Sequence, residues 1–272
     1  MSRSRPAMQP LITLKSMKKR VSWSSVHKQA NTDWQGVAAL DSTYFTLHGS
    51  TPGGKFWHLN GQKPIRFRPN KSQQLHVYAA ISAHGKTALH FASGTTGLKP
   101  QYSRVTKQGQ TVKLVGVGAQ EFQELMWEKL VPETRQLFNA AGAGEPTFLL
   151  DNAPAHAAKA TKKFLADKGV QVMPNWPSNS PDLNPIENVW GIMKQQVYRQ
   201  QYTKLEELKA AVLLAWAALP QSTLRNLMAG MHKRVEKVLR LRGLACTASG
   251  VCLNVLASDV GGWLQLMLGQ CV

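Results

Sequence analysis

Two aspartates in this chain of 272 residues stand at the ends of apolar runs. Asp41 follows V-A-A-L and Asp151 follows T-F-L-L, and these runs are typical of buried β-strands. Ligand sites in open α/β sheets usually lie at the carboxyl edge of the strands. If the two strands are neighbours, the two carboxylates therefore converge at one edge. The alternative for Asp151 is a turn residue whose side chain caps the following backbone amides.

A third carboxylate is supplied by the stretch N-S-P-D-L-N-P-I-E-N-V-W. Pro185 suits the first turn of a helix whose N-cap is Asn184, and Glu187 lies in that turn. An apolar stripe would face the core, formed by Ile186, Trp190, Met193 and Val197. Two alternatives stay open: Asn184 and Glu187 have the spacing of a capping box, and Asp182 is a rival third ligand.

Three converging carboxylates suit hard divalent cations, because Mg²⁺ prefers oxygen ligands and retains several waters. A site with two metal ions activates the attacking oxygen in phosphoryl transfer and stabilises the leaving oxygen, so no side-chain nucleophile is required. The chain has no Gly-rich P-loop and no H-E-x-x-H zinc motif. Six other acids fall on predicted helices, where a solvent-exposed helix face or the helix dipole accounts for a carboxylate without a catalytic role: Glu121, Glu124, Glu128, Glu133, Glu206 and Glu207.

The net charge of +18, from 33 basic and 15 acidic residues, indicates an anionic partner, with nucleic acid as the leading candidate. Residues 42–120 contain ten Lys or Arg and no Asp or Glu, so this region is the best candidate for a phosphate-backbone surface. The alternative is a basic loop without a nucleic-acid role. The predicted DNA contacts are Lys18, Lys19, Arg20, Arg66, Arg68, Lys71, Arg104, Lys107 and Lys113.

The cysteine pattern favours a reducing compartment. Three cysteines, an odd number without metal-ligand spacing, all fall in the last 27 residues, so neither a disulfide scaffold nor a zinc site is indicated. The basic N-terminus lacks the apolar core of a secretory signal. Asp259 and two glycines interrupt the most apolar stretch, so we expect no membrane span.

Periodicity along the chain predicts an α/β sheet. The expected helices cover residues 14–29, 121–141 with a break at Pro132, 157–168 and 205–243. The expected strands are antiparallel runs at 37–42, 44–49, 55–59, 75–82 and 87–92, followed by buried strands at 147–150 and 170–174. The last two strands and the helix between them suggest a right-handed parallel crossover.

Three motifs together resemble a known family: A-L-D-S-T-Y-F-T-L-H-G, L-D-N-A-P-A-H and N-S-P-D-L-N-P-I-E-N-V-W. They are similar to the catalytic domain of Tc1/mariner-type DDE transposases, and the resemblance covers roughly residues 15–243. Asp41, Asp151 and Glu187 fall on the family's three metal-binding acids. The 35 residues between the last two (187 − 151 − 1) are close to the family's characteristic spacing.

The resemblance implies an α/β fold, similar to ribonuclease H, with a mixed sheet, flanking helices and a C-terminal helical extension. It also implies cleavage and rejoining of double-stranded DNA at transposon ends with two Mg²⁺ or Mn²⁺ ions. Water would be the first nucleophile and the freed 3′ hydroxyl the second. A nuclear location, a homodimer and no membrane partner are expected. Asn152 and His156 match the second motif, and a structural role for His156 stays open.

The chain departs from the family in two places. Full-length relatives carry paired helix-turn-helix modules before the first acid, whereas only 40 residues precede Asp41 here. We therefore expect a truncated copy that does not recognise transposon ends. The second departure is Ser42, which stands where the family commonly has Glu. A non-catalytic or domesticated DNA-binding protein of the same fold is the alternative function. The expected domains are a basic arm at 1–36, the catalytic domain at 37–243 and an atypical, poorly ordered tail at 244–272.

Overall fold

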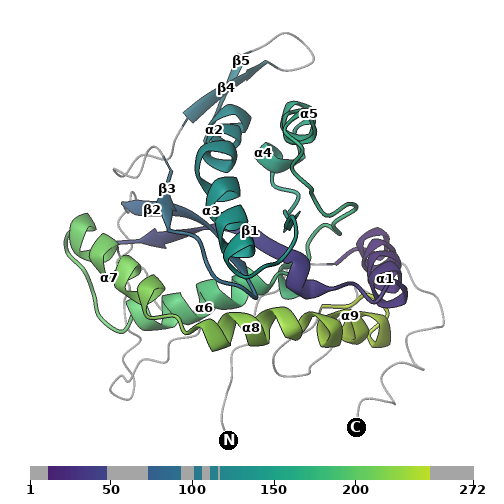
Figure 1. Ribbon diagram of the computed structural model, residues 1–272. Coiled ribbons are helices and arrows are strands. Elements are labelled where there is room, and N and C mark those ends of the chain that lie inside the picture. The colour runs from purple at the N-terminus through teal and green to yellow at the C-terminus, as the bar shows by residue number, and fades with distance from the viewer. Residues whose placement is uncertain (1–11, 48–72, 93–100, 106–110, 116, 246–272) are drawn as a thin grey trace, which may run out of the picture.

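A mixed β-sheet lies between layers of helices in the computed structural model, which describes residues 12–47, 73–92, 101–105, 111–115 and 117–245 (Figure 1). Its strand order is β3-β2-β1-β6. The strands are β1 (Val37–Thr46), β2 (Gln74–Ser82), β3 (His90–Phe91) and β6 (Thr147–Leu149). Because β1 pairs antiparallel with β2 and parallel with β6, the expected α/β mixed sheet is confirmed. A separate hairpin joins β4 (Gln101–Val105) to β5 (Thr111–Val115).

Helices cover both faces of the sheet (Figure 1). One face carries α2 (Ala119–Leu125), the π-helical turn η2 (Met126–Leu130), α3 (Val131–Ala140), α4 (Pro154–Ala157) and α5 (Lys159–Asp167). The other carries α6 (Pro185–Val197), α7 (Leu205–Ala217) and α8 (Gln221–Ala229), with α1 (Leu14–Gln29) and α9 (Met231–Arg240) side by side at one end. The short turns η1 (Trp34–Gly36) and η3 (Pro181–Leu183) complete the elements. Among the described helices, none combines the length and the apolar character that a membrane span requires.

The side chains of β1 alternate between two separate cores. Val37 and Ala39 belong to the core under α6, whereas Ala38 and Leu40 belong to the core under α2 and α3. Successive strand residues point to opposite faces, and both faces are buried here, so the run reads as continuously apolar. The same alternation places Asp41 on the α6 face of the sheet.

The helix that carries Glu187 forms as the sequence predicts. It begins at Pro185 after the N-cap residue Asn184. The predicted apolar stripe is confirmed, since its four residues are all 2% exposed or less: Ile186, Trp190, Met193 and Val197. This stripe packs α6 against the sheet and fixes the direction of its first turn.

Several predicted elements have different bounds. The two strands expected at 37–42 and 44–49 are the single strand β1, which pairs with β2 along its whole length except Val37. The helix expected to break at Pro132 continues from α2 into α3 through the π-helical turn η2. A proline ring clashes with the carbonyl four residues earlier in an α-helix, and a widened turn relieves that clash. The helix expected at 157–168 divides into α4 and α5 at Ala158, whose ψ of 135° is not helical.

The strand expected at residues 170–174 is wrong. Only an isolated parallel bridge forms there, between Phe148 and Val172. Val172 is 37% exposed, so one side of this segment faces solvent and its apolar composition did not require a full strand. The strand expected at 87–92 shortens to β3, and the run expected at 55–59 lies outside the described residues.

A buried arginine fixes the N-terminal helix, whose predicted span of 14–29 is confirmed by α1. The Arg20 side chain is 0% exposed, and its Nη1 and Nη2 donate to the two carboxylate oxygens of Asp182 at 2.8 and 2.6 Å. Its Nε also donates to the carbonyl oxygen of Gly243 at 2.9 Å. The expectation that Arg20 contacts DNA is therefore wrong, because its guanidinium is enclosed. Lys18 and Lys19 are exposed.

A second arginine holds the same region from α9. Arg234 donates through Nη1 to the carbonyl oxygen of Asp182 and through Nη2 to Oδ1 of Asn188, both at 2.9 Å. Asp182 lies in η3 just before α6, and Asn188 lies directly after Glu187. Both arginines therefore hold the start of α6 in position.

We expect Arg20→Met to lower the free energy of unfolding by about 3–5 kcal/mol, because Asp182 would keep a largely buried charge without its bidentate partner. Urea denaturation monitored by circular dichroism measures the change. Lys19→Met, at the adjacent exposed position, should stay within about 0.5 kcal/mol of the wild type. Equal losses in the two variants would contradict the assigned role of Arg20.

We expect His76 to make folding stability depend on pH. The His76 ring is 5% exposed, stacks on Tyr44 at 4.0 Å, and neither ring nitrogen has a hydrogen-bond partner among the described residues. Burial lowers the pKa of His76 from 6.5 to about 4. Between these values the unfolded chain binds a proton that the folded chain does not, so stability falls as the pH drops through this window.

The loss attributable to His76 between pH 7.5 and pH 5 should be about 2 kcal/mol. His76→Phe keeps an aromatic ring against Tyr44 and removes the titrating group. Urea unfolding of both proteins at both pH values isolates the contribution. An identical pH dependence in the two proteins would show that His76 is not responsible.

Candidate active site

The parallel pairing of β1 with β6 brings two of the predicted acids together. Ala39 pairs with Leu149, and continuing this register by two residues brings Asp41 level with Asp151. Leu149 shares the α6-side core with Ala39, so both aspartates follow on the same face of the sheet. Adjacent strands lie about 4.8 Å apart, which makes the two carboxylates neighbours.

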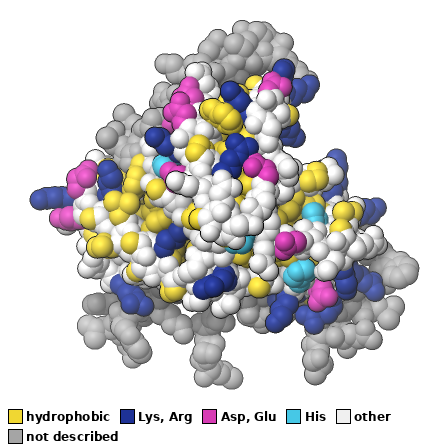
Figure 2. Space-filling view, in the orientation of Figure 1, with side chains coloured by type: hydrophobic (Ala, Val, Ile, Leu, Met, Phe, Trp, Pro, Cys, Tyr) yellow, Lys and Arg dark blue, Asp and Glu magenta, His cyan; other side chains and the backbone are white. Residues whose placement is uncertain are grey.

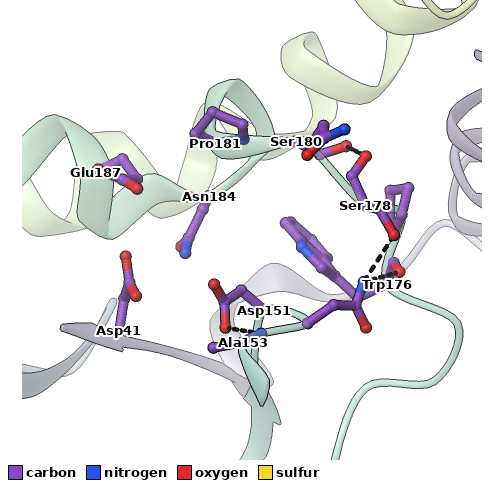
Figure 3. Close-up of a pocket in the computed structure, with 12 residues that line it drawn as sticks. Asp41, Asp151, Ala153, Trp176, Ser178, Ser180, Pro181, Asn184 and Glu187 are labelled. Atoms are coloured by element: carbon purple, nitrogen blue, oxygen red, sulfur yellow. Dashed lines mark hydrogen bonds between the residues drawn. The ribbon is translucent and has the colours of Figure 1, made fainter. Parts of the chain in front are cut away.

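Helix α6 supplies the third acid from above this face. Glu187 lies in the first turn of α6, and its carboxylate faces that of Asp41 in Figure 3. All three acids line one cavity of about 420 Å³. The other lining residues come from the turn after Asp151 and from the segment before α6: Asn152, Ala153, Trp176, Pro177, Ser178, Asn179, Ser180, Pro181 and Asn184.

Asp41 is the most strongly perturbed acid of the three. It is 7% exposed, and its Oδ1 accepts from the backbone amide of Ser42 at 2.7 Å. Burial, followed by the charges of Glu187 and Asp151, raises the pKa of Asp41 well above its ordinary value. The cavity therefore holds more negative charge than its neighbouring groups compensate.

Asp151 has a different environment. Its Oδ1 accepts from the amide of Ala153 at 2.9 Å and from Nδ1 of His156 at 2.6 Å. Burial alone would raise the pKa of Asp151, but the hydrogen bond and charge of His156, together with the Ala153 amide, lower it overall. The turn-capping alternative and the site position thus both hold, because one oxygen caps the turn while the other faces the cavity (Figure 3).

His156 is held by its own contacts. Its ring is 5% exposed and lies 4.1 Å from the ring of Phe122. This packing and the bond to Asp151 fix the orientation of the carboxylate, which is the usual function of residues that surround a metal ligand. A role for His156 in positioning Asp151 agrees with the second sequence motif.

Sequence reasoning missed Lys194. This residue lies seven positions after Glu187, two helical turns along the same face of α6, and its Nζ donates to Oγ1 of Thr43 at 2.6 Å. Burial raises the pKa of Glu187, and the charge of Lys194 partly offsets that effect. Burial in turn lowers the pKa of Lys194, although the charges of Glu187 and Asp41 oppose this shift. The spacing of seven residues from Glu187 was the only sequence signal for Lys194. This spacing places the two residues on one face of the helix but does not show that the face covers the acids.

The two alternatives for the third acid are resolved by hydrogen bonds. The capping box is wrong, because the Asn184 side chain makes no cap bond. Asp182 is bound by Arg20 and does not line the cavity. Glu187 is therefore the acid that joins Asp41 and Asp151.

Most predicted DNA contacts have no described side chain. Arg66, Arg68, Lys71 and Lys107 lie outside the described residues, and the side chains of Arg104 on β4 and Lys113 on β5 are also outside them. Figure 2 instead shows Lys and Arg side chains gathered over α1 and α9. The exposed members of this basic surface are Lys15, Lys18, Lys19, Lys28, Lys233, Arg240 and Arg242.

The residues of the cavity fit a divalent cation. The donors are carboxylate oxygens, which hard cations prefer, and their mutual repulsion favours a positive ion between them. Within the described part of the chain, no three His, Cys, Asp or Glu side chains form a compact cluster that would hold an ion directly. The acids instead line the walls of a wide cavity, which suits ions that retain part of their water shell.

Comparison with known proteins agrees with this arrangement. The family described as DDE superfamily endonuclease matches residues 37–209. The chain is 28% identical over 244 residues to the Transposable element Tc3 transposase of Caenorhabditis elegans, covering 88% of this chain but 65% of that protein, which is less than two thirds of its length. It is 25% identical over 242 residues to the Tcb1 transposase of Caenorhabditis briggsae, covering 88% and 80% of the two chains.

Solved structures share the fold. The Mos1 transposase paired-end complex with left transposon end superposes with a TM-score of 0.66 at 18% identity, covering 90% of this chain and 68% of that chain. The catalytic domain of Mos1 mariner transposase gives a TM-score of 0.61 at 18% identity, covering 87% and 98%. The family match spans more than half of the chain and contains all three acids. The chain therefore belongs to the DDE superfamily endonucleases, as a Tc1/mariner-type transposase catalytic domain.

Proposed function

We propose that this chain cleaves and rejoins DNA strands at transposon ends in a reaction that depends on divalent metal ions. The observation that carries the proposal is the convergence of Asp41, Asp151 and Glu187 in one cavity. These acids come from β1, the end of β6 and α6, so three separate elements must be in place to form the site. Several acids on one cavity wall are costly for a fold unless they bind a cation.

The residues of the site have different proposed roles. Asp41, Asp151 and Glu187 would hold two Mg²⁺ or Mn²⁺ ions, which when bound activate the attacking oxygen and stabilise the leaving oxygen of a phosphodiester. His156 and the Ala153 amide orient the Asp151 carboxylate. Lys194 balances part of the negative charge beside Glu187. The loop at 176–181 lines the same cavity, and the DNA strand would enter beside it.

Double-stranded DNA is the proposed partner. The net charge of +18 supports this, as does the basic surface over α1 and α9. The similar Mos1 proteins were solved as a paired-end complex with a transposon end and as a strand transfer complex, so assembly of two copies on DNA is part of the proposal. A DNA substrate also fits the expected nuclear location.

We expect the purified protein to nick supercoiled plasmid with Mg²⁺ or Mn²⁺, and Asp151→Asn to lower the nicking rate at least about 100-fold. The substitution removes the charge on a carboxylate that faces the cavity but keeps its shape. Agarose gel electrophoresis of the plasmid forms measures the rate. A chelator should abolish nicking by the wild type.

Asp167→Asn is the matched control, since it makes the same change at an exposed position on α5. It should retain full activity. Should a folded wild-type protein bind DNA without nicking it under either metal, the catalytic proposal would fail, and a non-catalytic DNA-binding protein of the same fold would be the better description.

We expect Asp41→Asn to raise the melting temperature of the protein in chelator, because the raised pKa of Asp41 reports an ionised form that burial and two neighbouring acids disfavour. A gain of roughly 2–4 °C is expected for each 1 kcal/mol of relief. Addition of Mg²⁺ should stabilise the wild type and not the variant. Differential scanning calorimetry measures both effects. A lower melting temperature for Asp41→Asn in chelator would contradict the assigned repulsion.

A further inference from the structure

Asn184 stands at the N-cap position of α6, but its side chain does not cap the helix. N-cap asparagines usually accept a hydrogen bond from a backbone amide of the first turn. Here the side chain makes no cap bond, and the Glu187 amide donates to the Asn184 backbone carbonyl at 3.3 Å instead. The side-chain amide therefore has no function in helix initiation.

The oxygen of this side-chain amide is also buried without a hydrogen-bond partner among the described residues. Asn184 is 3% exposed, and the unpartnered atom is its Oδ1. A buried polar atom that lacks a partner destabilises a fold, so native proteins contain few of them and retain them mainly where a ligand, ion or water binds. The packing of the protein alone does not account for an asparagine at this position.

The location of the amide supplies the missing explanation. Asn184 lines the cavity, and Figure 3 shows its side chain pointing between the Asp41 and Glu187 pair on one side and Asp151 on the other. Pro185 follows directly and restricts the backbone of Asn184 to an extended conformation, observed at φ −87° and ψ 113°. The side chain is thus aimed into the site by the local sequence.

We propose that the Asn184 side-chain oxygen is a fourth oxygen donor to the divalent cation that the three acids bind. This inference rests on the proposed function and adds a residue to its metal site. An amide oxygen suits a hard cation and brings no further negative charge. That property matters here because Asp41, Glu187 and Asp151 already repel one another. A fourth carboxylate would increase the repulsion, whereas an amide adds a ligand without doing so.

The test measures Mn²⁺ binding to the full chain by isothermal titration calorimetry and by electron paramagnetic resonance of the free ion. Asn184→Leu keeps the branched shape of the side chain and removes the oxygen, and Asn184→Ala removes it without adding bulk. Both should weaken Mn²⁺ binding roughly tenfold. Asn184→Asp restores an oxygen and should bind at least as tightly as the wild type.

A structural role for Asn184 predicts a different outcome. If the amide served the fold, Asn184→Leu would lower the urea midpoint in chelator. We expect the midpoint to stay equal or rise, because an unpartnered buried amide is replaced by an apolar side chain. Only a ligand role predicts both an unchanged or higher urea midpoint and weaker Mn²⁺ binding.

Ser180→Ala is the matched control. Ser180 is also 3% exposed and lines the same cavity, but its hydroxyl donates to the Ser178 carbonyl oxygen at 3.3 Å. Its Mn²⁺ affinity should stay within about twofold of the wild type. The inference is overturned if Asn184→Leu and Asn184→Ala bind Mn²⁺ like the wild type, or if Ser180→Ala weakens binding equally. If the wild type binds no Mn²⁺, the inference and the metal-dependent function both fail. If Asp151→Asn loses Mn²⁺ binding while the Asn184 variants keep it, the inference fails and the metal-dependent function is still supported.

Discussion

The parallel pairing of β1 with β6 is the contact on which the site depends. Its register sets Ala39 opposite Leu149, and the two acids follow at equal distance along each strand. A shift of one residue would turn one carboxylate into the opposite core. The apolar residues before each acid prevent such a shift, because Ala38 and Leu40 must pack under α2 and α3 while Val37 and Ala39 pack under α6. Burial on both faces therefore fixes the chemistry at the strand ends.

The acids create an electrostatic conflict that the surrounding residues only partly relieve. Asp151 is stabilised in its charged form by His156, and Glu187 is partly balanced by Lys194, but Asp41 is buried with a strongly raised pKa. The unpartnered oxygen of Asn184 adds a second local cost to folding. Both costs lie in the cavity that the three acids line. Local destabilisation of this kind is typical of sites that are completed by a ligand.

The arginines of α1 and α9 connect the N-terminal helix to the active site. Arg20 and Arg234 both bind Asp182, and Arg234 also binds Asn188 on the helix that carries Glu187. Gly243 permits this packing, since a Cβ atom there would lie 2.5 Å from the Met17 carbonyl oxygen, and its φ of +89° favours glycine. A helix that the sequence presents as a basic arm is thus part of the support for the third acid.

The resemblance to a known family singled out the three acids among the candidates, whereas the sequence by itself determined the helix start at Pro185, the apolar stripe of α6 and an α/β sheet. These follow from local rules, namely strand alternation, helical periodicity and the constraints of proline. Tertiary structure alone decided that Asp182 binds Arg20 rather than a metal, that Lys194 lies beside Glu187, and that the segment at 170–174 forms one bridge instead of a strand. The reason is that the partner of a charged or polar group is chosen by residues distant in sequence, such as the 162 positions that separate Arg20 from Asp182. Periodicity shows which side chains are buried, but not which distant group each one meets there.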